Sequence, residues 1–200
     1  MSYETNIESV EIELKNLGSA LSNDDIEERD LKLTQISRRF SEMHDWQRSL
    51  GVAEMISGSY EKSEVLRKVA DYLALNGHLE RAFFVFSEAE REAVSNSLAE
   101  WQQAELLLAI ALSLYQTRAS FRANEIIARA IIIAQQGELT QNAQNSLDAS
   151  SVLAEISWQT ALRGNVDSAL MIAKTIKNFG KRDSILHKFS IEFGEVKTAA

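Results

Sequence analysis

The segment Lys68–Glu90, KVADYLALNGHLERAFFVFSEAE, contains two amphipathic stretches that meet at Asn76-Gly77. Counted from Leu66, apolar or small residues follow at +3, +4 and +7, on one face of a helix with a period of about 3.6 residues. Apolar or small residues at +16, +20 and +23 share one face of a second helix. Because Ala70 (+4) and Ala82 (+16) are small, two antiparallel helices can approach closely there. The segment therefore predicts a helical hairpin.

The same spacing occurs three more times in the chain. Starting from Leu33, Leu107 and Leu153, the equivalent positions are apolar or small, except for Thr160 at +7 of the last copy. Every +4 and +16 position is Ala or Ser. A fifth start at Leu186 gives a first helix only before the sequence ends. Since one hairpin cannot bury its own apolar face, neighbouring copies are expected to stack.

This spacing resembles that of the tetratricopeptide repeat, a helix–turn–helix unit of about 34 residues. The resemblance covers roughly residues 30–193 and concerns spacing more than sequence, because the family usually ends each unit with Pro and this chain has none. It implies an all-α fold, namely a right-handed α-solenoid of about four antiparallel helix pairs with capping helices at both ends. The complete copies start 33, 41 and 46 residues apart, so we expect degenerate units with extra residues in 90–101 and 134–151.

We expect a single domain over residues 1–200, built from ten helices. A cap helix (1–22) precedes the repeats and a half repeat (181–200) follows them; the four repeats occupy residues 30–61, 62–97, 103–147 and 149–180. The expected helices span residues 5–20, 24–43, 46–58, 62–76, 79–94, 98–116, 119–135, 147–163, 166–178 and 182–195. Ser22–Asp24 is an expected N-cap, and Gly137 and Gly180 are expected helix ends. The first helix has an expected apolar stripe formed by Val10, Leu14, Leu17 and Leu21.

The composition agrees with a helical chain and excludes several classes of protein. No Pro and only 8 Gly in 200 residues leave few helix breakers. The absence of Cys excludes disulfides, thiolate catalysis and Cys-bound metals. No apolar run approaches the ~20 residues that a membrane helix needs. The acidic N-terminus lacks the positive and apolar regions of a secretory signal, so we expect a cytoplasmic protein.

The net charge of −8 is unevenly distributed along the chain. Residues 1–30 carry nine acidic and two basic side chains, whereas residues 170–200 carry six basic and three acidic ones. The acidic balance argues against binding of nucleic acid and of anionic membranes. The opposite charges of the two ends provide a possible contact between copies of the chain.

No pattern in the sequence indicates catalysis, a metal site or a cofactor. His44, His78 and His187 lack a second ligand at a recognised metal-binding spacing. The acidic run 23–30, NDDIEERD, lacks the alternation and central Gly of a calcium loop. The sequence contains no GxGxxG, GxxxxGK[ST] or GxSxG motif. We therefore expect a protein that is not an enzyme and binds neither metal nor cofactor.

Solenoids of this kind bind partners on their concave surface, and in the resembling family the first helices line that groove. Positions +1, +5 and +8 of each copy predict a groove that changes from charged to apolar and aromatic. The expected partner-binding residues are Arg38, Arg67, Asp71, Leu108, Leu112, Tyr115 and Trp158. For the apolar end two alternatives stay open: the chain itself covers these residues, or a partner does.

The leading hypothesis is a non-catalytic adaptor or assembly chaperone that binds a peptide or protein in this groove. Trp158 and Leu112 would supply affinity, and Arg38 and Arg67 would select acidic groups. The alternatives are a homo-oligomeric scaffold assembled through the charged ends, and a small-molecule sensor or enzyme within a closed solenoid.

Two apolar clusters provide a further test of how the chain is packed. Phe83–Phe86 and Ile131–Ile133 fall on second helices and are expected in the core between repeats. The alternative is a surface for self-association, and Phe84 and Ile132 are the residues whose exposure should be checked.

Overall fold

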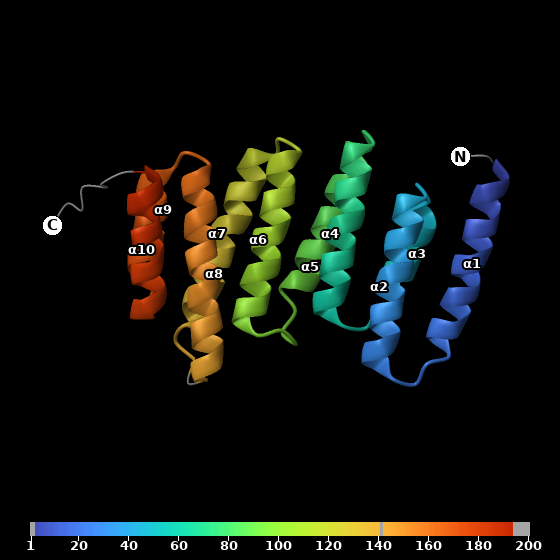
Figure 1. Ribbon diagram of the computed structural model, residues 1–200, viewed down its shortest axis with the longest axis horizontal. Helices are drawn as coiled ribbons and strands as arrows, with labels where there is room; N and C mark the ends of the chain where they lie inside the picture. Colours follow the sequence, from blue (N-terminus) through green and yellow to red (C-terminus); the bar gives the residue numbers. More distant parts are fainter. Residues whose placement is uncertain (1–2, 141, 194–200) are drawn as a thin grey trace. The chain divides into compact units, whose positions relative to one another are not determined.

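The computed structural model describes residues 3–140 and 142–193, with side chains from Ser9 onward. Over this range the chain forms ten α-helices and no strand, which confirms the expected all-α class. None of these helices combines the length and apolarity needed to cross a membrane. The helices are α1 (Tyr3–Leu21), α2 (Ile26–Glu42), α3 (Trp46–Glu54), α4 (Ser59–Leu75), α5 (Leu79–Ala93), α6 (Glu100–Gln116), α7 (Ser120–Gly137), α8 (Ala143–Leu162), α9 (Val166–Thr175) and α10 (Phe179–Phe193) (Figure 1).

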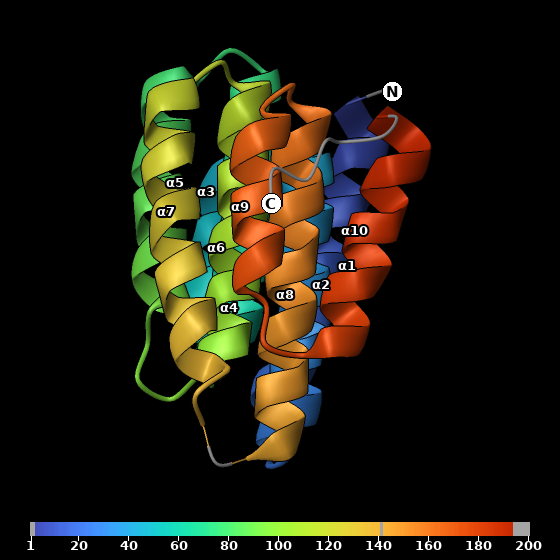
Figure 2. The ribbon, with the colours of Figure 1, turned by 90° about the vertical axis from the view of Figure 1, so that its left-hand side faces the viewer.

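The chain divides into two compact units, each with two layers of helices. Unit 1 comprises residues 1–98 and 112–119, and unit 2 comprises residues 99–111 and 120–200, so α6 contributes to both. In unit 1, α1, α2 and α4 form one layer and α3 and α5 the other (Figure 1 and Figure 2). In unit 2, α8 contacts α7, α9 and α10, and α10 shares its layer (Figure 2).

The expected helices are all present, but some of their ends differ. Asp25, not Ser22–Asp24, is the N-cap of α2: its Oδ1 accepts hydrogen bonds from the N–H groups of Glu27 (3.0 Å) and Glu28 (3.1 Å). Gly137 is the last residue of α7, as expected. Gly180 lies inside α10 and ends no helix, so that expectation was wrong.

The positions shared by the four hairpins are buried. The reference Leu residues and the residues at +3, +4, +16, +20 and +23 are at most 8 % exposed, whereas Thr160 at +7 is half-buried. Ser37 Oγ donates to the Ser49 carbonyl (2.8 Å), and Ser157 Oγ donates to the Ala169 carbonyl (2.6 Å). Both bonds join position +4 to position +16, so the small residues lie where the two helices of a hairpin approach closely.

Four turns with a common geometry follow the first helices. The residue at +11 has a positive φ, which is 62° at His44, 82° at Gly77, 63° at Arg118 and 85° at Gly164. In each turn the N–H at +11 donates to the carbonyl at +8, and the N–H at +12 donates to the carbonyl at +7. The second of these bonds is the one that defines a Schellman C-cap. Two of the four turns thus place a residue with a side chain in the left-handed region.

This geometry predicts opposite effects of two substitutions. A side chain in the left-handed region costs roughly 1 kcal/mol, so Arg118→Gly should raise the free energy of unfolding by about 0.5–1 kcal/mol. Gly164→Ala should lower it by about 1 kcal/mol, although a Cβ there would meet no atom within 4 Å. Urea unfolding at equilibrium measures both changes. A stability loss in Arg118→Gly would contradict the argument.

The longer intervals between copies arise in part because some of the second helices are longer than others. α5 and α7 continue well past +23 of their copies, to Ala93 and Gly137, whereas α3 and α9 stop at Glu54 and Thr175. The expected extra residues in 90–101 and 134–151 are therefore partly helical.

Buried carboxylates hold the chain where α3 and α9 end. Asp30 is 4 % exposed, and its Oδ2 accepts from the N–H groups of Ser57 (2.9 Å) and Gly58 (2.8 Å). Glu138 is 6 % exposed, and its Oε1 accepts from the Lys177 N–H (2.9 Å) and the Ser150 hydroxyl. These bonds satisfy backbone N–H groups in the connections that follow α3 and α9.

The apolar stripe expected for the first helix is partly wrong. Leu14 and Leu21 are 46 % and 49 % exposed, while Ala20 and Glu13 are buried. Glu13 Oε1 accepts a hydrogen bond of 2.7 Å from Arg39 Nη1 on α2. Glu13 therefore lies on the face of α1 that packs against α2. Leu14 and Leu21, which were expected on that face, do not lie on it.

Phe84 and Ile132 are also not core residues, contrary to the expectation for their clusters. Phe84 is 67 % exposed and Ile132 is 55 % exposed, whereas Val85 and Phe86 beside Phe84 are buried. Each helix buries only part of its circumference, and both residues point away from the buried face.

Candidate binding surfaces on the first helices

The sequence-predicted binding residues fall in both units, and we describe each unit separately. Arg38 is exposed, Leu112, Tyr115 and Trp158 are half-buried, and Leu108, at 5 % exposure, offers almost no surface. Unit 1 contains Arg38, Arg67, Asp71, Leu112 and Tyr115, and unit 2 contains Leu108 and Trp158.

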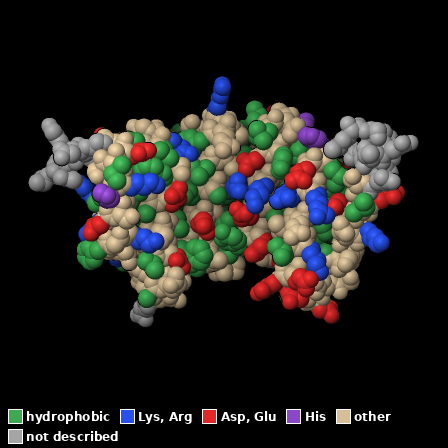
Figure 3. Space-filling model, in the orientation of Figure 1, with side chains coloured by type: hydrophobic (Ala, Val, Ile, Leu, Met, Phe, Trp, Pro, Cys, Tyr) green, Lys and Arg blue, Asp and Glu red, His purple; other side chains and the backbone are tan. Residues whose placement is uncertain are grey.

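Charged side chains of both signs cover the layer of unit 1 that contains α2 and α4 (Figure 3). Arg38 on α2 pairs with Glu42 one turn later, with 3.2 Å between Arg38 Nε and Glu42 Oε1. Both side chains are largely exposed, so this pair contributes only about 0.3–0.5 kcal/mol. Arg38 can therefore exchange Glu42 for an outside carboxylate at little cost.

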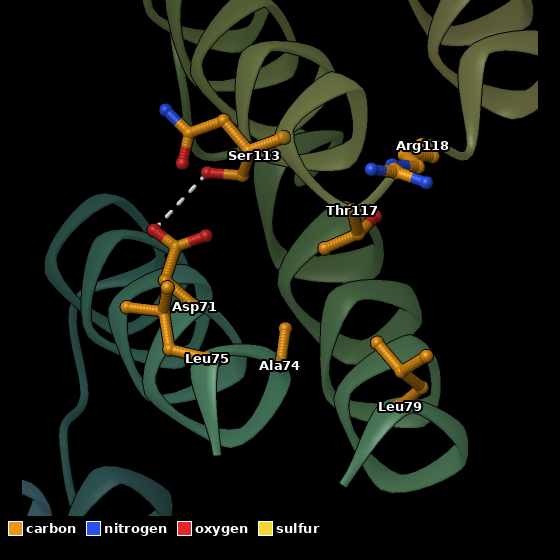
Figure 4. Close-up of a pocket in the computed structure, with 8 residues that line it drawn as sticks. Asp71, Ala74, Leu75, Leu79, Ser113, Thr117 and Arg118 are labelled. Carbon is orange, nitrogen blue, oxygen red and sulfur yellow. Dashed lines mark hydrogen bonds between the residues drawn. The ribbon is translucent and has the colours of Figure 1, made fainter. Parts of the chain in front are cut away.

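Arg67 and Asp71 on α4 join Ser113 on α6 in a polar group that we call the Asp71 cluster. Arg67 Nη1 lies 2.9 Å from Asp71 Oδ2 and 3.2 Å from Ser113 Oγ. Ser113 Oγ donates to Asp71 Oδ2 at 3.1 Å (Figure 4). Glu64 also contacts Arg67, at 3.4 Å. Because its charge has two carboxylate neighbours within the chain, Arg67 is less available to a partner than Arg38.

The pKa values of Asp71 and of Glu64, which contacts the Asp71 cluster through Arg67, are shifted in opposite directions. Burial raises the pKa of Asp71 above its ordinary value of 3.8, and the hydrogen bond from Ser113 and the charge of Arg67 offset only part of that rise. Burial also works to raise the pKa of Glu64, but Lys68 and Arg67 outweigh it, so the pKa of Glu64 is lowered.

The raised pKa of Asp71 predicts a pH dependence of stability. The folded state binds this proton more tightly than the unfolded state, so the stabilisation is complete below pH 3.8 and is lost as the pH rises through the folded pKa. Asp71→Asn removes this titration. We therefore expect the stability of Asp71→Asn relative to the parent protein to rise with pH over this interval. Urea unfolding in a pH series measures the difference, and a difference that falls with pH would contradict the assignment.

A cleft of about 260 Å³ lies beside the Asp71 cluster in unit 1. Asp71 and Leu75 line it from α4 and Ser113 faces Asp71 from α6, while Leu79 and Arg118 lie on the other side (Figure 4). Pockets for drug-sized ligands usually measure roughly 300–1,000 Å³. The size of this cleft suits one or two side chains of a partner better than a cofactor.

Trp158 on α8 belongs to an aromatic group in unit 2 that we call the Trp158 cluster. Its ring stacks on Phe189 with 6.0 Å between centroids and 15° between planes, and Phe193 lies 5.9 Å away. Lys188 Nζ lies 3.6 Å from the centre of the Trp158 ring. All three neighbours come from α10, so at this residue the chain's own last helix covers part of the expected binding surface (Figure 2).

A second cleft, of about 230 Å³, opens between α8 and α10 next to the Trp158 cluster. We call it the α8–α10 cleft. From α8 it is lined by Ser151, Ala154, Glu155 and Trp158, and from α10 by Lys181, Ser184, Ile185 and Lys188. Trp158 was expected here, and the lysines were not. They lie seven residues apart on α10, so the helical period already places them on one face.

Ser113 and Arg118 were also missed by the sequence reasoning. Ser113 follows the core position Ala111 by two residues and carries no distinguishing pattern. Arg118 occupies a turn position where a Gly would have signalled the geometry. Only the packing of α4 beside residues 112–119 brings these side chains together.

Over the described residues, no group of three or more His, Asp or Glu side chains is arranged to hold a metal ion. Comparisons of this chain with protein-family models, with curated proteins and with solved structures give no match.

Proposed function

We propose that this protein is a non-catalytic module that binds a polypeptide partner, and that its helix pairs stack as a right-handed α-solenoid of the tetratricopeptide type. The four common turns and the shared buried positions support equivalent hairpins. In each unit the first helices also lie side by side in one layer, as the proposed arrangement requires.

One observation carries the proposal of binding. The positions that the four hairpins share are buried and serve the fold, whereas the accessible positions of the first helices differ from one hairpin to the next. Position +5 is Arg38, Asp71, Leu112 and Trp158 in the four copies. A constant framework with variable accessible side chains is how a repeat protein builds a specific surface. Trp, Tyr and Arg are also the residues most enriched among binding hot spots.

The test is capture of a partner from lysate by the tagged protein and by four variants of verified fold. Leu112→Ala and Trp158→Ala change the first helices of units 1 and 2. Phe121→Ala and Met171→Ala are matched controls, since these residues are apolar, 79 % and 65 % exposed, and lie on second helices. Loss of the partner in a first-helix variant, with retention in both controls, is the expected result. Loss in the controls alone would overturn the assignment.

Self-assembly through the charged ends is a second candidate. Four acidic side chains are exposed where α1 meets α2, namely Asp24, Asp25, Glu27 and Glu28 (Figure 3). However, Glu13 and Asp30 are buried and bonded within the chain, so the acidic end offers less charge to a second copy than its composition suggests. Light scattering at low and high salt tests this candidate, and a monomer at every salt concentration would exclude it.

A further inference from the structure

We infer that the α8–α10 cleft binds an acidic segment of the partner polypeptide, in which a carboxylate side chain lies next to an apolar one. This inference rests on the proposed function and adds the chemistry of the partner.

The α8–α10 cleft has two basic side chains in its lining. Lys181 and Lys188 line it from α10. Among the described residues, neither the Lys181 nor the Lys188 ammonium has a carboxylate within ion-pair distance. The Lys188 ammonium lies over the Trp158 ring. The remaining basic side chain of this helix, Arg182, lies over Phe179 and near Asp183. A carboxylate that enters the cleft could pair with Lys181 or with Lys188 without breaking an existing ion pair.

The lining of the α8–α10 cleft is part polar and part apolar, and the cleft is small. Ser184 adds a hydroxyl donor, while Trp158 and Ala154 provide apolar surface. Glu155 also lines the cleft, and Gln159 donates to its Oε1 at 2.7 Å. The cleft therefore combines positive charge with an apolar wall. At about 230 Å³ it takes side chains of a polypeptide more readily than a cofactor.

Trp158 also affects the position of one of the two lysines, because the Lys188 ammonium lies over its ring. An ammonium group over an indole ring is attracted by the ring's negative face but keeps room for an anion on its open side. The contact with the Trp158 ring thus gives Lys188 a favoured position where it lines the cleft. A positioned cation loses less conformational entropy when it pairs with a carboxylate.

The test uses a fluorescein-labelled peptide that alternates pairs of Glu and Leu, and a second peptide in which Gln replaces every Glu. Fluorescence anisotropy measures both affinities for the intact protein at low and high salt. We expect the Glu peptide to bind at least about tenfold more tightly than the Gln peptide, with the difference shrinking as salt is added.

Three variants separate this cleft from a general effect of charge. Lys181→Glu and Lys188→Glu reverse charges in the cleft and should each weaken binding of the Glu peptide by about tenfold. Lys174→Glu makes the same charge change at an exposed site at the end of α9 and should change affinity by less than about twofold. Lys188→Gln keeps a long side chain without the charge. It should weaken binding of the Glu peptide relative to the parent protein, but by less than Lys188→Glu does.

Each other outcome overturns the inference in a distinguishable way. If the two peptides bound equally and Trp158→Ala abolished their binding, the preference for acidic segments would be refuted. The proposed function would still hold. Equal effects of Lys174→Glu and Lys188→Glu on the affinity would show that the peptide does not bind in the α8–α10 cleft. Preference for a single-stranded oligonucleotide over the Glu peptide would replace the polypeptide with a nucleic acid, and both proposals would then fail.

Discussion

Ala70→Leu should lower the free energy of unfolding by about 3 kcal/mol. Ala70 is fully buried on α4 at position +4, and Ala82, at +16 on α5, is fully buried as well. The hydrogen bonds of Ser37 and Ser157 show that positions +4 and +16 approach closely in the equivalent hairpins. A Leu at this point has no space unless α4 and α5 separate, and overpacking of a tight core typically costs 1–3 kcal/mol or occasionally more. Urea unfolding measures the change.

Two further substitutions make this prediction specific. Ala128→Leu introduces the same side chain at an exposed position of α7 and should change stability by no more than about 0.5 kcal/mol. Ala70→Ser should cost less than about 1 kcal/mol, because Ser occupies the same position in two other hairpins and bonds to a carbonyl of the second helix. If Ala70→Leu were as stable as Ala128→Leu, the close approach of α4 and α5 would be refuted.

The features that the sequence predicted well are those that repeat. Small residues at +4 and +16 and apolar residues around them follow the helical period, so the burial of these shared hairpin positions could be read directly from spacing. The helix ends were predicted less well. Caps depend on single side chains such as Asp25, and the left-handed turn residues His44 and Arg118 look like ordinary residues in the sequence.

Contacts between elements were beyond what spacing can predict. Glu13, Asp30 and Glu138 read as surface carboxylates, yet each is buried because a donor from another element faces it. The candidate surfaces show the same limit. Trp158 was predicted from its position within one hairpin, while Lys181 and Lys188 join it only because α10 packs against α8.

Asp30→Ala should lower the free energy of unfolding by about 2–3 kcal/mol. Gly58, the N-cap of α4, has no side chain to satisfy the start of that helix. Asp30, on α2, accepts hydrogen bonds from the N–H groups of Ser57 and Gly58, the two residues just before the first residue of that helix. Each hydrogen bond to a charged group contributes roughly 1.5–3 kcal/mol when it is not replaced by water, and the negative charge also interacts favourably with the helix dipole. Solvent reaches Ser57 and so recovers part of this loss.

A graded series distinguishes the hydrogen bonds from the charge. Asp30→Asn keeps an acceptor oxygen but no charge, so it should lose about half as much stability as Asp30→Ala. Asp24→Ala removes an exposed carboxylate from the preceding turn and should change stability by no more than about 0.5 kcal/mol. The Arg29 guanidinium donates to the Ser57 hydroxyl at 2.7 Å and lies 3.6 Å from Asp30 Oδ1. Loss of the Asp30 carboxylate therefore also removes an ion pair of Arg29. Equal, small effects of Asp30→Ala and Asp24→Ala in urea unfolding would show that the Asp30 carboxylate does not stabilise the connection that leads into α4.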